Sequence, residues 1–164
     1  MHKPMLIKDK RGRYRVQGSF QPQDLVRVAV NILKEEISST EIMSNPVATA
    51  RFLQLSLARE KNENFAVLFL TTQHHLIRFE TLFTGTLDGA SVYRRVVVQK
   101  ALEYNAGAVI FAHNHPSGAC EPSVADRQIT RRLVDTLALV DIRVLDHFVV
   151  SHTGWVSFSE RGLL

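Results

Sequence analysis

The chain has 164 residues, of which 45% are hydrophobic and 22% charged, so its length and composition indicate one globular domain with a hydrophobic core. A single cysteine excludes an internal disulfide framework and, because no stretch is long and apolar enough to span a bilayer, we expect a cytoplasmic protein without a membrane partner. The net charge of +4 leaves open an acidic partner such as nucleic acid.

Part of the positive charge gathers at the N-terminus. Residues 1–20, which we expect to be irregular or weakly extended, hold six cations against one acid: Lys3, Lys8, Lys10, Arg11, Arg13 and Arg15 against Asp9. Such a basic arm could bind nucleic acid, but it is more often a solvated terminus, and no RNA-binding aromatic motif or zinc-finger spacing accompanies it. Nucleic acid is therefore the less favoured interpretation of the arm.

Two helices are expected before the first buried strand. Apolar residues recur at helical spacing over 22–37. Asn45 and Pro46 then suit the N-cap and first position of a second helix, which should run to about Arg59 and bury Val47.

Strands and helices alternate through the rest of the chain. The first two strands should form a hairpin whose turn exposes His74 and His75. The expected elements in order are strands 65–70 and 76–82, a helix from Ser91 to about Tyr104 that buries Leu102, strand 108–112, helix 124–140, and strands 143–150 and 155–158. This order predicts an α/β fold, with one mixed sheet and helices packed against it.

Two histidines end the buried strand 108–112. His113 and His115 are two residues apart, so both imidazoles point to the same face of the strand. After a loop, Ser123 and Asp126 have the spacing of a helix capping box. The helix start therefore brings a carboxylate near the end of the strand, where open α/β sheets usually carry their sites.

Two imidazoles and one carboxylate form the ligand set of a catalytic zinc site. Three protein ligands leave a fourth position for a water molecule, whose pKa zinc lowers to about 7. The spacing also allows a simpler interpretation, because His-x-His is often an ordinary strand pair and Ser-x-x-Asp an ordinary capping box. A thiolate from Cys120 in the same loop would occupy the fourth position and close the site. For His147, on the strand 143–150, we expect a packed or ligand-supporting role in preference to a ligand.

A zinc-bound water needs a carboxylate base that lies close to the metal without binding it. Glu63 immediately precedes the first buried strand and could lie at the rim of the sheet, although a solvated loop acid is the simpler interpretation. Other chemistries have no support, since the chain contains no nucleophile elbow, Walker A loop, dinucleotide-binding glycine motif or zinc-deaminase pattern.

The spacing His113-x-His115, seven residues, Ser123, two residues, Asp126 resembles the signature of the JAMM (MPN/JAB) metallopeptidase superfamily. The fuller text, His-Asn-His-Pro-Ser-Gly followed by Pro-Ser-x-x-Asp, resembles its RadC-like branch over about residues 50–162. The resemblance implies a single JAMM/MPN-like α/β domain, similar to cytidine deaminases, with a mixed sheet flanked by helices.

The resemblance also implies a role for each residue of the site. His113, His115 and Asp126 would hold Zn²⁺. Glu63 would act as base and then acid, and Ser123 would support the oxyanion. The implied function is a zinc-dependent metallopeptidase or isopeptidase acting on a peptide or protein substrate. The alternative is a DNA-repair-associated or protein-binding module without turnover.

The same resemblance divides the chain into a basic arm and helix over 1–44 and a JAMM/MPN domain over 45–164. Full-length RadC-like proteins resemble a helix-hairpin-helix module followed by this domain. Here only two helices are predicted before Glu63, so the chain resembles the short form that lacks this module. A second departure is Arg-Arg-Val at 94–96, where the family usually reads Pro-Arg-Glu. Because all of the metal and base positions are filled, this departure weakens the carry-over of the family's substrate contacts or helix packing and not that of the zinc chemistry.

Overall fold

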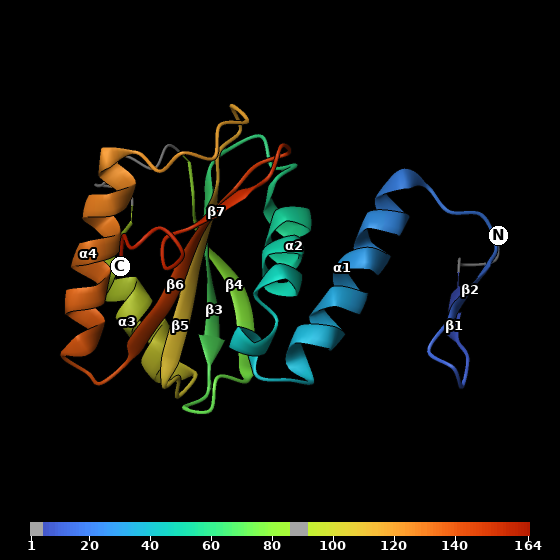
Figure 1. Ribbon diagram of the computed structural model, residues 1–164, viewed down its shortest axis with the longest axis horizontal. Coiled ribbons are helices and arrows are strands. Elements are labelled where there is room, and N and C mark those ends of the chain that lie inside the picture. Colours follow the sequence, from blue (N-terminus) through green and yellow to red (C-terminus); the bar gives the residue numbers. More distant parts are fainter. Residues whose placement is uncertain (1–4, 86–91) are drawn as a thin grey trace.

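The computed structural model describes residues 5–85 and 92–164 (Figure 1). Its elements in chain order are β1 (Met5–Lys8), β2 (Tyr14–Gln17), α1 (Pro22–Ser38), a 3-10 turn η1 (Ile42–Ser44), α2 (Pro46–Leu57), β3 (Asn64–Leu70), β4 (Leu76–Thr84), α3 (Arg94–Glu103), β5 (Ala108–Asn114), α4 (Val124–Ala138), β6 (Arg143–Val150) and β7 (Trp155–Ser157). The predicted order of helices and strands holds from α1 onward. The first 20 residues differ from the prediction, because β1 and β2 pair there as an antiparallel hairpin.

The main sheet has five strands in the order β4-β3-β5-β6-β7. β3 is antiparallel to both β4 and β5, and β7 is antiparallel to β6. Only β5 and β6 are parallel, and a parallel pair needs a crossover, which α4 provides. The first turn of α4 therefore lies near the end of β5, and the loop 115–123 between them lies at one edge of the sheet.

Helices cover both faces of the sheet, as Figure 1 shows, with α1 and α2 on one side and α3 and α4 on the other. The central strands β3 and β5 are buried along their whole length. Alternate residues of β5 enter different cores: Ile110 packs in the core on the α2 side and Phe111 in the core on the α3 and α4 side. His113 is in phase with Phe111 and so faces α4.

Three local predictions need correction. Val47 is 48% exposed and Leu102 is 56% exposed, because each lies on the solvent side of its helix. His74 is only partly exposed, since its ring contacts Glu41 and Arg143. The expected cap at residue 91 lies outside the described residues, and α3 begins at residue 94. Within the described ranges, no helix is both long and apolar enough to cross a membrane.

Candidate metal centre

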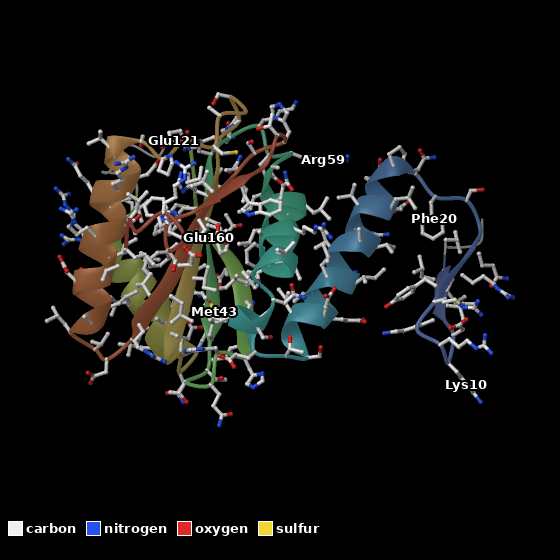
Figure 2. All side chains as sticks on the ribbon, in the orientation of Figure 1. Lys10, Phe20, Met43, Arg59, Glu121 and Glu160 are labelled. Atoms are coloured by element: carbon white, nitrogen blue, oxygen red, sulfur yellow. The ribbon has the colours of Figure 1, made fainter. Side chains whose placement is uncertain are left out.

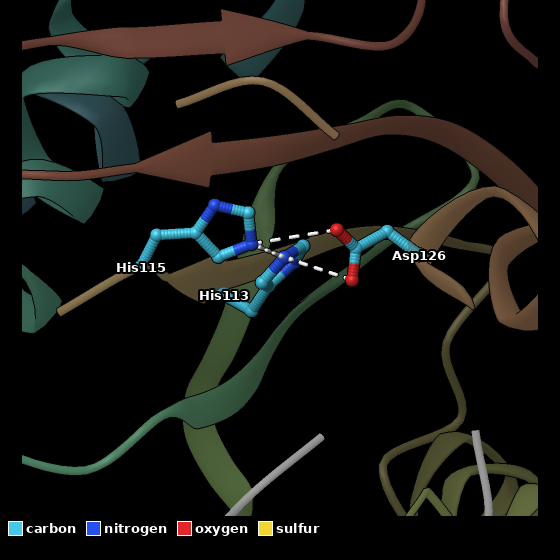
Figure 3. A group of neighbouring side chains, drawn as sticks. All are labelled: His113, His115 and Asp126. Atoms are coloured by element: carbon cyan, nitrogen blue, oxygen red, sulfur yellow. Dashed lines mark hydrogen bonds and ion pairs between the residues drawn. The ribbon is translucent and has the colours of Figure 1, made fainter. Parts of the chain in front are cut away.

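The two histidines at the end of β5 and the aspartate in the first turn of α4 meet at one point (Figure 3). The Nε2 atoms of His113 and His115 lie 3.0 Å apart. The Oδ1 atom of Asp126 is 3.3 Å from His113 Nε2, and its Oδ2 atom is 3.4 Å from His115 Nε2. His113 and Asp126 are buried and His115 is half-buried, so the cluster opens to solvent on the His115 side.

These distances fit a zinc ion. Ligand atoms about 2.0–2.1 Å from a tetrahedral centre lie about 3.3 Å from one another. The three separations of 3.0, 3.3 and 3.4 Å are close to that value. Two neutral imidazoles whose Nε2 atoms face each other at this distance need a proton or a cation between them. The donor set and its spacing therefore match three of the four corners of a zinc tetrahedron.

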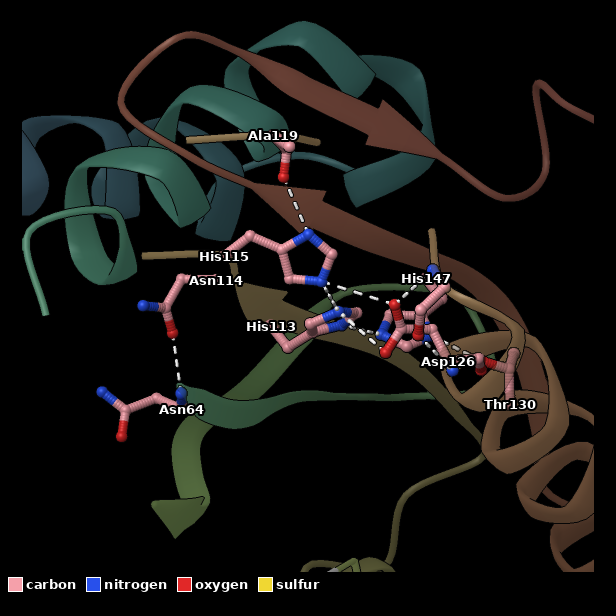
Figure 4. A network of polar contacts seen from close by, with 9 residues as sticks. Asn64, His113, Asn114, His115, Ala119, Asp126, Thr130 and His147 are labelled. Atoms are coloured by element: carbon pink, nitrogen blue, oxygen red, sulfur yellow. Dashed lines mark hydrogen bonds and ion pairs between the residues drawn. The ribbon is translucent and has the colours of Figure 1, made fainter. Parts of the chain in front are cut away.

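A chain of hydrogen bonds fixes the tautomer of His113 (Figure 4). Thr130 Oγ1 donates to the Asp126 carbonyl at 2.6 Å, so it can only accept from His147 Nδ1, also at 2.6 Å. Burial holds the pKa of His147 well below its usual value of 6.5, so this ring is neutral and its Nε2 carries no proton. His113 Nδ1 must then donate to His147 Nε2 at 2.8 Å. The Nε2 lone pair of His113 is thereby left free for a metal.

The second histidine is held in the same form by the loop that follows it. His115 Nδ1 donates to the carbonyl of Ala119 at 2.8 Å, which leaves its Nε2 as the ligand atom. Gly118 allows this loop to close, because its φ of +92° is in the left-handed region and a Cβ there would lie 2.5 Å from the His152 ring. Both imidazoles are thus oriented by backbone or core partners before any ion binds.

The charges of the cluster also suit a cation. Burial alone would raise the pKa of Asp126, but the nearby His113 and His115 rings, which favour the carboxylate when either is protonated, and the hydrogen bond from the Ser123 amide lower it well below 3.8. The hydrogen bond that the protonated ring of His115 donates to Asp126 raises the pKa of His115 above 6.5, with a smaller contribution from the negative charge of Glu63. Asp126 is therefore a carboxylate throughout the neutral range and supplies the negative charge that a divalent ion requires.

Ser123 and Asp126 form the predicted capping box at the start of α4. Ser123 Oγ accepts from the Asp126 amide at 3.0 Å, and Asp126 Oδ2 accepts from the Ser123 amide at 2.7 Å. The cap has two effects, because it satisfies free amides of the helix and also aims the Asp126 carboxylate at the histidines. The hydroxyl hydrogen of Ser123 has no acceptor within the described part of the chain.

Glu63 lies on the same edge of the sheet, outside the three-residue cluster. β3 and β5 pair with Phe65 opposite His113, and continuing this register puts Glu63 opposite His115. The charge of Glu63 acts on His115, which agrees with that placement. Beside it is an open hollow of about 330 Å³ lined by residues of three segments: Lys61, Asn62, Glu63, Gly85, Pro116 and Ser117.

The role of Asn114 was not predicted. It is the last residue of β5, is buried, and binds the segment that carries Glu63 (Figure 4). Its Oδ1 accepts from the Asn64 amide at 2.7 Å, and its Nδ2 donates to the carbonyls of residues 62 and 60 at 3.1 and 3.3 Å. One side chain therefore ties the loop before β3 to the strand that carries the histidines. The sequence contains no signal for this contact.

Cys120 lies in the loop between β5 and α4. Its thiol lies 2.9 Å from Ser151 Oγ, and it is not part of the cluster of potential metal ligands found among the described residues. His147 has the predicted supporting place beside His113 and offers no atom to the cluster.

Known proteins resemble this chain over most of its length. The sequence model of the family described as RadC-like JAB domain matches residues 43–163. A UPF0758 protein of Methylibium petroleiphilum is 54% identical over 140 residues, which are 85% of this chain and 63% of that protein. A UPF0758 protein of Vibrio cholerae is 50% identical over 155 residues, which are 94% of this chain and 98% of that protein. The chain thus spans less than two thirds of several relatives and nearly all of another. These names state no activity.

Proposed function

Because this chain belongs to the RadC-like JAB domain family, we propose that it is a zinc-dependent hydrolase that cleaves a peptide or isopeptide bond. The observation that carries the proposal is the convergence of two imidazole Nε2 lone pairs and one carboxylate, with separations of 3.0–3.4 Å, at the open edge of the sheet. Three protein ligands leave one position for water, which is the arrangement of catalytic rather than structural zinc.

In this proposal His113, His115 and Asp126 hold the ion, which when bound supplies a Lewis acid and a water molecule of lowered pKa. Glu63 accepts the proton of that water during attack on the amide carbonyl and returns it to the leaving amine. Ser123 donates its hydroxyl hydrogen to the developing oxyanion while its oxygen still caps the helix. The hollow beside Glu63 offers room for a segment of the peptide or protein substrate.

The test compares Glu63→Gln with Glu60→Gln, a control in the same loop that removes the same charge. Each zinc-loaded protein is incubated with a proteome-derived peptide library, and new amino termini are counted by mass spectrometry. Glu63→Gln should keep stoichiometric zinc and lose at least about 100-fold in cleavage, since a general base typically contributes 10²–10⁴-fold. Glu60→Gln should cleave like the wild type. Undiminished cleavage by Glu63→Gln would contradict the proposed mechanism.

A zinc-binding module without turnover is the alternative. It shares the metal ligands but needs neither a base nor an open coordination position. If the zinc-loaded wild type generates no new amino termini in the library and none from lysine-linked isopeptides, that result supports the alternative and removes the hydrolase. Zinc content measured on the same samples separates this outcome from a failure to load the metal.

A further inference from the structure

The N-terminal hairpin concentrates the positive charge of the molecule. Residues 8–15, which form its turn and the adjoining strand ends, contain five cations and one acid and so carry a net charge of +4. The whole chain also has a net charge of +4, so all its other residues together are formally neutral. A field of one sign at a single protruding element is the electrostatic pattern of a polyanion-binding surface.

The hairpin stands apart from the sheet and its helices. Figure 1 shows β1 and β2 beyond α1, and in Figure 2 Lys10 lies at the outer end of the turn. Every described residue from 7 to 19 is exposed. A two-stranded hairpin alone is only marginally stable in water, which is consistent with a surface that is completed by a partner.

Asp9 orders the backbone of the turn and pairs with one of its cations. The Asp9 carboxylate accepts from the amides of Arg11 and Arg13 at 2.8 and 2.9 Å and pairs with the Arg13 guanidinium at 2.9 Å. The charge of Arg13 is therefore already matched. Lys8 stacks over Tyr14, whereas the side chains of Lys10, Arg11 and Arg15 have no ion-pair partner among the described residues. Four cations thus remain available to bind an anionic partner.

We propose that this hairpin is a binding surface for double-stranded DNA, contacted mainly through its phosphates. A two-stranded ribbon fits the major groove, which is about 12 Å wide, and four unmatched cations complement the closely spaced phosphates along it. An anionic membrane fits less well, because insertion needs apolar side chains at the leading end and the turn 9–13 contains none. A second copy of the chain offers no net acidic charge outside the hairpin.

The test measures the salt dependence of binding to a fluorescein-labelled 20-base-pair duplex of random sequence by anisotropy, with the full zinc-loaded chain. Four phosphate contacts give a slope of log K against log salt of about −3.6, which is about a 150-fold loss of affinity between 50 and 200 mM salt. The variant that replaces all four cations by glutamine should have a slope near zero: Lys8→Gln, Lys10→Gln, Arg11→Gln and Arg15→Gln.

A matched control removes the same charge from exposed positions of the body: Lys34→Gln, Arg51→Gln, Arg131→Gln and Arg132→Gln. This control should keep the wild-type slope. A second variant, Lys10→Gln with Arg11→Gln, changes only the turn outside the β1–β2 ladder, so the hairpin stays paired and the slope should fall by about half. The proposal is overturned if the duplex does not bind at 50 mM salt, if the control loses as much affinity as the hairpin variant, or if only phosphatidylserine vesicles bind.

Discussion

Replacing His147 by phenylalanine should weaken zinc binding although His147 is not a ligand. The ring is fully buried, lies edge-on to Phe65 and Phe111 and stacks on Phe158 with ring centroids 4.7 Å apart. Phenylalanine can occupy this space. The substitution removes His147 Nε2, which accepts the hydrogen bond from His113 Nδ1. That bond keeps the proton on Nδ1 of His113 and so leaves the Nε2 lone pair free.

The expected magnitude follows from the burial of His113, whose side chain is 1% exposed. Water cannot replace the lost partner, and a buried donor without an acceptor costs about 1–3 kcal/mol. If the proton moves to Nε2 instead, the ligand atom itself is lost. Removing a partner that orients a metal ligand typically costs 10–100-fold in affinity, or about 1.4–2.7 kcal/mol, which overlaps the first range. The zinc Kd of His147→Phe should therefore rise 10–100-fold.

The assay is a titration of zinc against a competing fluorescent chelator, with thermal unfolding of the metal-free proteins measured in parallel. Ser157→Ala is the control, because Ser157 is also buried and donates a hydrogen bond of 2.6 Å to Asp146, but contacts no ligand. It should lower the melting temperature and leave the zinc Kd unchanged. A folded His147→Phe protein whose Kd stays within threefold of the wild type would refute the tautomer argument.

Three further outcomes are expected. Asn114→Ala leaves the buried Asn64 amide without its acceptor and frees two partly exposed loop carbonyls, so urea denaturation should show a loss of about 1–3 kcal/mol in unfolding free energy; an unchanged midpoint would contradict the clamp. Gly118→Ala forces a side chain into a left-handed φ and should cost about 1–3 kcal/mol in the same assay, whereas Gly154→Ala, which has open space around it, should not. In the metal-free protein the lowered pKa of Asp126 stabilises the fold above pH 3.8, and this stabilisation is lost on acidification. The raised pKa of His115 stabilises the fold below pH 6.5, and this stabilisation is lost as the pH rises through the raised pKa. Melting curves of Asp126→Asn, recorded as a function of pH, should lack the loss on the acid side.

The parts of the site that were predictable are those that depend on local geometry. His113 and His115 share a face because side chains alternate along any strand, and the capping box aims Asp126 wherever a helix starts at that point. The parallel β5–β6 pair needs a crossover, so α4 had to begin near the end of β5. These constraints act within about 20 residues and do not require knowledge of distant packing.

The supporting contacts were not predictable because they depend on strand register. The β5–β6 ladder has a shift between Val109 and Ile110, after which Phe111 pairs with His147. Without that shift Asp146 would occupy the place of His147, since a slip of one residue turns each side chain to the other face. The clamp by Asn114 likewise joins segments 50 residues apart. The N-terminal hairpin was missed because its apolar residues stay exposed, so hydrophobic periodicity gives little sign of it.

The sheet, and not the ion, holds the ligands in place. His113 ends a strand that is hydrogen-bonded on both sides, and Asp126 is anchored by its own helix cap. We therefore expect the metal-free protein to keep its fold, in contrast to a zinc finger, whose chain is ordered only by its metal. If zinc binds as proposed, we expect chelation and reloading to be reversible, so that cobalt can replace zinc as a spectroscopic reporter without refolding the chain.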